Sequence, residues 1–199
     1  MVKTITRIFS TLRQKVELAK YDDFTIGEYF RKRGARVGKN CRIMVRSFGS
    51  EPYLVSIGDH CTIAPGAVLS THDGAAWIFT EEFPNLQRFG RIEIRDNCFI
   101  GTHAIILLDV VIGPNSIVGA GAVVTRDVPP GMVVGGCPAR PICTVQKYKE
   151  KVLQQWEQQR PPGYLDDLRP GTPYSPAYIQ RRKTRAFGHL RDHLANTLK

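Results

Sequence analysis

The amino-acid sequence predicts a mainly β fold, a parallel β-helix whose turns of chain stack on one another. Two periodic features in fixed phase predict it. An aliphatic residue recurs at every sixth position from residue 94 onward, and a small or compact residue follows each of the first five by four places. A six-residue period fits neither a 3.6-residue helix nor a hairpin meander. The aliphatic positions are Ile94, Ile100, Ile106, Ile112, Val118 and Val124, and the small positions are Cys98, Ala104, Val110, Ser116 and Ala122.

The same frame occurs earlier in the chain. Three hexapeptides complete one triangular coil of about 18 residues, so each aliphatic side chain should point inward and each small residue should fit a tight corner. A glycine directly follows several inward positions, as at Gly58 and Gly101, where close backbone approach is needed. The earlier pairs of an aliphatic and a small residue are Val37 with Cys41, Ile43 with Ser47, Ile57 with Cys61, and Ile63 with Ala67.

The frame breaks after Leu69, and residues 71–91 form an excursion from the predicted coils. A loop of roughly 20 residues inside a compact repeat is usually functional. This one holds a histidine, an aspartate, two glutamates and a tryptophan. We therefore expect a catalytic domain over residues 35–143 whose chemistry involves this excursion.

Helical segments are predicted on both sides of the coils. In residues 1–34, apolar residues recur at helical spacing among basic ones, which predicts an amphipathic helix that caps the open first coil or, alternatively, docks on a membrane surface. In residues 144–199, a helix over 145–159 precedes a Pro-rich stretch and a final basic helix at about 177–198. The RRKTR run at 181–185 is either a solvated face or a contact for acidic lipid or another subunit.

The net charge of +10 is concentrated in the flanks. Residues 1–40 carry +6, residues 41–143 carry −2 and residues 144–199 carry +6. This distribution argues against nucleic-acid binding by the coils. It fits polyphosphate ligands or peripheral contact of the ends with an anionic membrane. The alternative is that the charges serve only solubility. The sequence shows neither an apolar run long enough for a membrane span nor a secretory signal, so we expect a cytoplasmic protein. Five cysteines without a C-x-x-C pair argue against a disulfide framework or a zinc site.

Residues 57–143 resemble the hexapeptide-repeat acetyltransferases, particularly the galactoside, maltose and xenobiotic O-acetyltransferases and the acyltransferases of polysaccharide assembly. The resemblance rests on the segments SIGDHCTIAPGAVLSTHD and IEIRDNCFIGTHAIILLDVVIGPNSIVGAGAVVTRDVPPGMVVGGCPARPI. It implies a left-handed β-helix, acetyl-CoA as the acyl-donor cosubstrate, and a homotrimer whose active sites lie between subunits.

His72, in the THD motif, matches the family's catalytic histidine. A thioester is already activated, so transfer needs only a base and a positioned acceptor, and histidine can take the acceptor's proton near neutral pH. The alternative is a structural loop histidine. Any of three acids, Asp73, Glu81 or Glu82, would orient this histidine or bind acceptor hydroxyls. Trp77 would either stack on a sugar ring or anchor the loop.

The resemblance also implies residues that bind CoA, since small residues admit the slender pantetheine arm and guanidinium groups suit phosphate. They are Thr102 and Ala120 along the pantetheine, Thr125 and Arg126 beside the distal part of CoA, and Arg140 at a phosphate. Of the other histidines, His60 should lie exposed at a corner, and His103 either at a corner or near the CoA thiol. No metal is expected, because the spaced histidine pair of the zinc-dependent γ-class carbonic anhydrases on this fold is missing.

Together these features predict an acetyl-CoA-dependent acetyltransferase that O-acetylates a sugar in cell-surface polysaccharide biosynthesis. Two alternatives stay open. The same base would serve N-acylation of an amino-sugar nucleotide, which differs in product linkage. A non-catalytic β-helix scaffold would instead bind partners through its basic ends and would not bind CoA.

Overall fold

The computed structural model describes residues 12–159 of the 199-residue chain. The chain divides into two compact units, one up to residue 145 and one from residue 146. Helix α3 (Val145–Gln159) begins at the residue that the sequence predicts and continues to the end of the described residues. Residues 1–11, the Pro-rich stretch and the predicted helix at about 177–198 with its RRKTR run lie outside the described residues.

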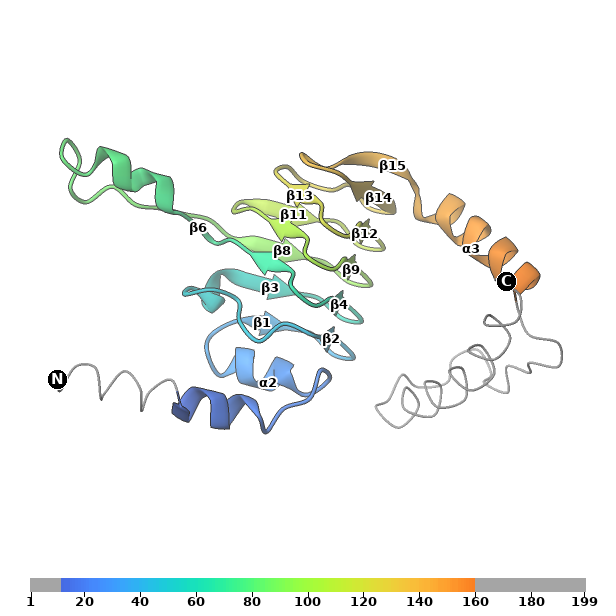
Figure 1. Cartoon of the computed structure of the whole chain (residues 1–199), viewed down its shortest axis with the longest axis horizontal. Helices are drawn as coiled ribbons and strands as arrows, with labels where there is room; N and C mark the ends of the chain where they lie inside the picture. The colour runs from blue at the N-terminus through green and yellow to red at the C-terminus, as the bar shows by residue number, and fades with distance from the viewer. Residues whose placement is uncertain (1–11, 160–199) are drawn as a thin grey trace, which may run out of the picture. The chain divides into compact units, whose positions relative to one another are not determined.

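Short parallel strands stack into three sheets, one on each side of a triangular coil (Figure 1). The chain visits the sheets in turn, the coils wind left-handed, and the predicted left-handed parallel β-helix is thereby confirmed. The first sheet contains β1 (Arg36–Val37), β3 (Val55–Ile57), β8 (Ile92–Ile94) and β11 (Val110–Ile112). The second contains β2 (Arg42–Ile43), β4 (Thr62–Ile63), β9 (Phe99–Ile100), β12 (Ile117–Val118), β14 (Met132–Gly135) and the antiparallel β15 (Arg140–Thr144). The third contains β5 (Val68–Leu69), β10 (Ile105–Ile106) and β13 (Val123–Val124).

Inward-pointing aliphatic side chains form the core, as the six-residue period predicts. The repeating positions from Ile94 to Val124 are buried, and so are the small residues that follow them. Strand pairing shows the length of one coil directly, because Ile94 pairs with Ile112, 18 residues further on. Each coil therefore covers the apolar side chains of its neighbour, which is the main stabilising contribution in a solenoid.

The first coil departs from the predicted frame. Its strands pair with the next coil at a spacing of 20 residues, as Val37 does with Ile57, so it is two residues longer than a regular coil. The prediction that Ser47 fills a tight corner of the repeat is wrong, because the extra length shifts the frame: Ser47 is exposed and Phe48 is buried instead. This longer segment includes the 3-10 helix η1 (Pro52–Leu54).

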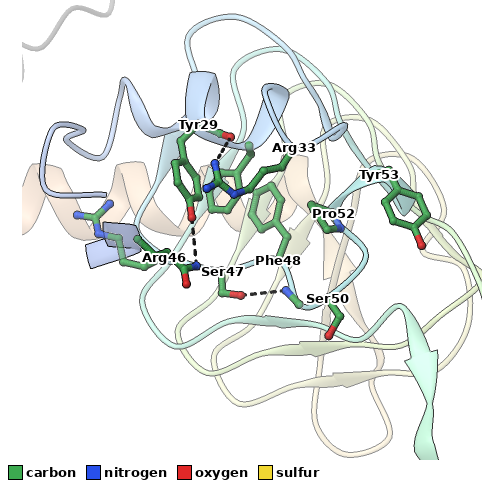
Figure 2. A pocket seen from close by; sticks show the side chains of 11 residues that line it. Tyr29, Arg33, Arg46, Ser47, Phe48, Ser50, Pro52 and Tyr53 are labelled. Carbon is green, nitrogen blue, oxygen red and sulfur yellow. Dashed lines mark hydrogen bonds between the residues drawn. The ribbon is translucent and has the colours of Figure 1, made fainter. Parts of the chain in front are cut away.

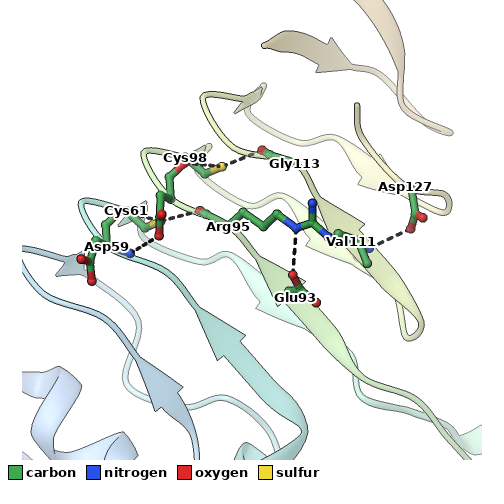
Figure 3. Close-up of polar contacts among 9 residues, drawn as sticks. Asp59, Cys61, Glu93, Arg95, Cys98, Val111, Gly113 and Asp127 are labelled. Atoms are coloured by element: carbon green, nitrogen blue, oxygen red, sulfur yellow. Dashed lines mark hydrogen bonds and ion pairs between the residues drawn. The ribbon is translucent and has the colours of Figure 1, made fainter. Parts of the chain in front are cut away.

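Cysteines occupy matching corners of successive coils and bond across them (Figure 3). The Cys61 thiol donates to the Arg95 carbonyl at 3.0 Å, and the Cys98 thiol donates to the Gly113 carbonyl at 3.1 Å. Cys41 makes the same type of contact one coil earlier. The three cysteines are thus corner residues, as the repeat frame predicts.

The N-terminal end of the coils is closed mainly by α2 (Ile26–Arg31), whose large side chains are buried in the core. Residues 12–18 are also helical, but Leu12 and Val16 are 58% and 60% exposed. These two side chains therefore do not cover the first coil, which α2, also within the predicted cap over residues 1–34, closes. Among the helices of the described residues, none is long and apolar enough to cross a membrane.

The excursion leaves the coils as an arm built on two short antiparallel strands, β6 (His72–Asp73) and β7 (Arg88–Phe89) (Figure 1). Between them the chain forms the 3-10 helix η2 (Gly74–Phe79). The Asp73 carboxylate caps this helix by accepting a hydrogen bond from the Ala75 N–H at 3.0 Å. The cap fixes the start of η2 next to β6.

Candidate active site

His72 begins β6, where the chain leaves the third side of the second coil. Nδ1 of its imidazole lies 2.9 Å from Oε2 of Glu51. The same carboxylate oxygen accepts a hydrogen bond from the hydroxyl of the buried Thr71 at 2.8 Å. The His72 side chain is 47% exposed and that of Glu51 only 12%. The imidazole is thus held from the protein side through Nδ1, which leaves Nε2 as the nitrogen for a substrate.

Glu51 reaches this position because of the longer first coil. It directly precedes η1 and lies 20 residues, one such coil, before Thr71. Burial raises the pKa of the Glu51 carboxyl, but hydrogen bonds from His72 and Thr71 outweigh this effect and leave the pKa below its ordinary value. Glu51 is therefore a carboxylate that orients the ring through Nδ1.

Glu51 holds the His72 ring in place of the three acids that the sequence offered as its partners. Asp73 caps η2 and pairs with Arg88 at 3.4 Å. Glu81 and Glu82 are exposed in the turns that follow η2, outside the pocket beside His72. The orienting role expected of these acids belongs to Glu51, which the sequence analysis missed because it lies outside the repeat frame.

A pocket of about 340 Å³ opens beside His72, between the arm and the chain that precedes η1. Trp77, 77% exposed, supplies one wall, and the ring centroid of Phe89 lies 6.2 Å from that of His72. The polar side chains in the lining include Ser50, Glu51, Asp73, Gln87 and Arg88. The structure therefore brings the predicted residues His72, Asp73 and Trp77 into one pocket.

Two of the residues implied for CoA come together near the last coils. Arg126 and Arg140 line a pocket of about 230 Å³. Asp127 lines it too, but its carboxylate accepts a hydrogen bond from the Val111 N–H at 2.8 Å (Figure 3). Two guanidinium groups in one pocket suit a phosphate.

The remaining residues implied for CoA lie on the surface of the coils. Thr102 and Ala120 are exposed on neighbouring coils, and the Thr102 carbonyl accepts a hydrogen bond from the Gly121 N–H at 2.8 Å. Thr125 is exposed directly after β13. The three lie outside the linings of the pockets beside His72 and Arg140.

His60 and His103 are corner residues. Both have a left-handed φ of 56°. Nδ1 of His60 lies 2.7 Å from Oδ1 of Asn97 in the next coil, and the His103 ring lies over Gly66, where a Cβ would overlap it. The predicted exposed corner position of His60 is confirmed. Across residues 12–159, three or more His, Cys, Asp or Glu side chains do not gather in a group that could hold a metal ion.

The triangular β-helix and the histidine at the base of its arm define a hexapeptide-repeat transferase. Residues 91–126 match the family model described as bacterial transferase hexapeptide (six repeats). The chain is 45% identical to Protein CapG of Staphylococcus aureus over 127 residues, which cover 62% of this chain and 74% of CapG. It is 39% identical to galactoside O-acetyltransferase of Escherichia coli over 92 residues, which cover 46% of this chain and 45% of that enzyme. The chain belongs to the hexapeptide-repeat acetyltransferase family.

A solved structure supports the architecture independently. The hexapeptide-repeat acetyltransferase VCA0836 from Vibrio cholerae superposes with a TM-score of 0.55 at 24% identity, covering 67% of this chain and 87% of that one. This likeness shows the fold. The chain spans less than half of the length of the galactoside enzyme, so the name of that enzyme does not identify the substrate or partners of this chain.

Proposed function

We propose that the protein transfers an acetyl group from acetyl-CoA to a hydroxyl of a sugar, with His72 as the general base. The observation that carries the proposal is the bond between His72 and Glu51 beside a pocket with exposed aromatic rings. A histidine held by a carboxylate at one nitrogen is suited to move a proton at the other.

The reaction follows from the orientation of this pair. Nδ1–H of His72 donates to Glu51, so Nε2 takes the proton of the acceptor hydroxyl as its oxygen attacks the thioester carbonyl carbon. A backbone N–H stabilises the oxyanion of the tetrahedral intermediate. When the carbon–sulfur bond breaks, the CoA sulfur takes the proton from Nε2, which yields free CoA and an acetyl ester. Ionised Glu51 stabilises the imidazolium between these two steps.

The donor site follows the coils toward Arg126 and Arg140, whose shared pocket suits the phosphates of CoA. Thr102, Ala120 and Thr125 would line the path of the pantetheine chain. Support for an acetyl donor comes from the relative named galactoside O-acetyltransferase.

The acceptor would bind in the pocket beside His72. Trp77 and Phe89 offer apolar faces on which a sugar ring can stack, and Asp73 and Arg88 offer groups that bond its hydroxyls. The name of the galactoside enzyme supports a sugar hydroxyl as the acceptor. We place the reaction in the cytoplasm, on precursors of a cell-surface polysaccharide.

A homotrimer would complete the donor site. The arm exposes an apolar group consisting of Trp77, Ile78, Phe79, Phe83 and Leu86. Exposed apolar patches of this kind mark interaction surfaces. In a trimer, the arm of one subunit would cover CoA lying on the coils of its neighbour. The basic charge of residues 1–40 and 144–199 would favour peripheral contact with an anionic membrane.

The test is a product analysis. The purified protein is incubated with acetyl-CoA and a panel of neutral sugars, amino sugars and sugar nucleotides, and products are identified by mass spectrometry and by cleavage in mild base. A base-labile acetyl ester supports O-acetylation, whereas a base-stable amide supports the alternative of N-acylation. A protein that binds no CoA and forms neither product contradicts the proposal and favours the scaffold.

A further inference from the structure

A second pocket, of about 320 Å³, lies beside the first coil at its N-terminal end (Figure 2). Its walls come from three parts of the chain: the helical residues 12–18, α2 with the turn after it, and the longer first coil over residues 46–53. Polar and aromatic side chains share the lining, which includes Tyr29, Arg33, Arg46, Ser47, Ser50 and Tyr53. Neither the repeat frame nor the reaction chemistry accounts for this pocket.

This pocket adjoins the one beside His72. Ser50 lines both, and Glu51, which holds His72, is the next residue in the chain. A ligand whose hydroxyl lies at Nε2 of His72 would therefore have to pass Ser50 to reach the second pocket.

Two guanidinium groups line the second pocket, and each forms an ion pair with a carboxylate. Arg33 lies 3.6 Å over the ring of Tyr29 and donates to Glu17 at 3.1 Å. Arg46 donates to Asp23 at 3.0 Å. A guanidinium has five N–H donors, so these contacts fix the direction of each group and leave donors for a ligand.

We infer that the second pocket binds the phosphate of a phosphorylated acceptor, a sugar 1-phosphate or a sugar linked to a nucleoside diphosphate. The lining contains two arginines from different elements and the serines Ser47 and Ser50, a set of donors that suits an anion of more than one charge better than a single carboxylate. Tyr53, 62% exposed at the same pocket, offers a face for a nucleobase. The inference rests on the proposed function, because the second pocket would bind the part of the same acceptor that lies farthest from the reacting hydroxyl.

The probes are UDP and inorganic pyrophosphate, titrated by calorimetry into the full chain with CoA in excess to occupy Arg126 and Arg140. Arg33→Gln and Arg46→Gln should each weaken the binding of both probes about tenfold or more, as expected for the loss of a charge-assisted hydrogen bond. UDP should bind more tightly than pyrophosphate if a nucleoside diphosphate is the natural group, and equally if the acceptor is a sugar 1-phosphate.

Three variants serve as matched controls. Arg95→Gln removes an arginine that pairs with Glu93 on the coils and lines neither pocket, so it should leave probe binding unchanged. Glu17→Gln and Asp23→Asn break the same ion pairs as the two arginine variants but keep the cations. They should bind the probes at least as tightly as the wild type, which distinguishes a phosphate site from a purely structural ion pair.

Wild-type protein that binds neither probe overturns the inference, and so does binding that Glu17→Gln and Asp23→Asn weaken as much as the arginine variants do. His72→Ala separates this inference from the proposed function, because it should lose acetyl transfer and still bind UDP. Acetyl transfer without probe binding overturns the phosphate site alone. Probe binding that depends on Arg33 and Arg46, without transfer to any acceptor, supports the site and overturns the acetyltransferase proposal.

Discussion

Oε2 of Glu51 lies 2.9 Å from Nδ1 of His72, although 21 residues separate them in the chain. The contact joins the irregular part of the first coil to the first residue of the arm. It gives the histidine a fixed tautomer and a nearby negative charge, the two properties that a general base in acyl transfer needs.

Removing the charge of Glu51 should slow acetyl transfer. We expect Glu51→Gln to lower kcat about a hundredfold with a smaller change in the KM for the acceptor, because the amide keeps the side chain's size but no longer stabilises the imidazolium. Steady-state kinetics with acetyl-CoA measure this effect. Glu81→Gln is the matched control, since Glu81 is exposed on the arm outside the pocket and should behave like the wild type. Equal rates in all three proteins would remove Glu51 from the mechanism.

The stability of the protein should depend on the ionisation of Glu51. Its pKa in the folded state is lowered from the ordinary value of 4.5, so the carboxylate stabilises the fold above that pH, and this contribution is lost as the pH falls through the lowered pKa. The difference in unfolding free energy between the wild type and Glu51→Gln should therefore shrink as the pH falls below that ordinary value. Denaturant titrations between about pH 5 and about pH 3 test the sign. A difference that grows over this range would contradict the assignment.

Arg126 and Arg140, near the last coils, should contribute to the binding of acetyl-CoA. Arg126→Gln and Arg140→Gln should each raise the KM for acetyl-CoA about tenfold, since each removes charge-assisted hydrogen bonds to phosphate. The effect should be weaker for a truncated thioester donor that lacks the nucleotide. Arg95→Gln is the control, because Arg95 pairs with Glu93 and its loss should leave the KM for acetyl-CoA unchanged. An unchanged KM in both arginine variants would place CoA elsewhere.

Close packing of the corners should make Gly58 sensitive to substitution. A Cβ on Gly58 would overlap the Asp96 carboxylate and lie 2.9 Å from the Arg95 carbonyl carbon, both in the next coil. We expect Gly58→Ala to lower the free energy of unfolding by about 1–3 kcal/mol, as overpacking does. Gly74→Ala is the control, because a Cβ there meets nothing within 4 Å. Denaturant unfolding that shows the two variants equally stable would contradict this packing.

The sequence was sufficient for the repeating part of the fold. The six-residue period from Ile94 to Val124 correctly predicts which side chains are buried, because every coil repeats the same contact between inward side chains. The frame failed at Ser47, where the first coil is two residues longer. The apolar pattern of Leu12 and Val16 did not show that these side chains are exposed while α2 closes the coil.

The site was predictable only in part. His72, Asp73 and Trp77 are neighbours in the sequence, so the arm places them together. Glu51 comes from the preceding coil, and its contact depends on the 20-residue spacing that pairs β1 with β3. Counting 20 residues back from Thr71 would have found Glu51, but only once the extra length of the first coil was known.

The most direct test of the central claim is the rate of thiol release from acetyl-CoA, with and without a sugar acceptor, for the wild type and His72→Ala. If His72 is the base, release depends on the acceptor and falls by at least about a hundredfold in the variant, while both proteins bind CoA equally. Acceptor-dependent release at equal rates in the two proteins would contradict the assignment of His72 as the general base.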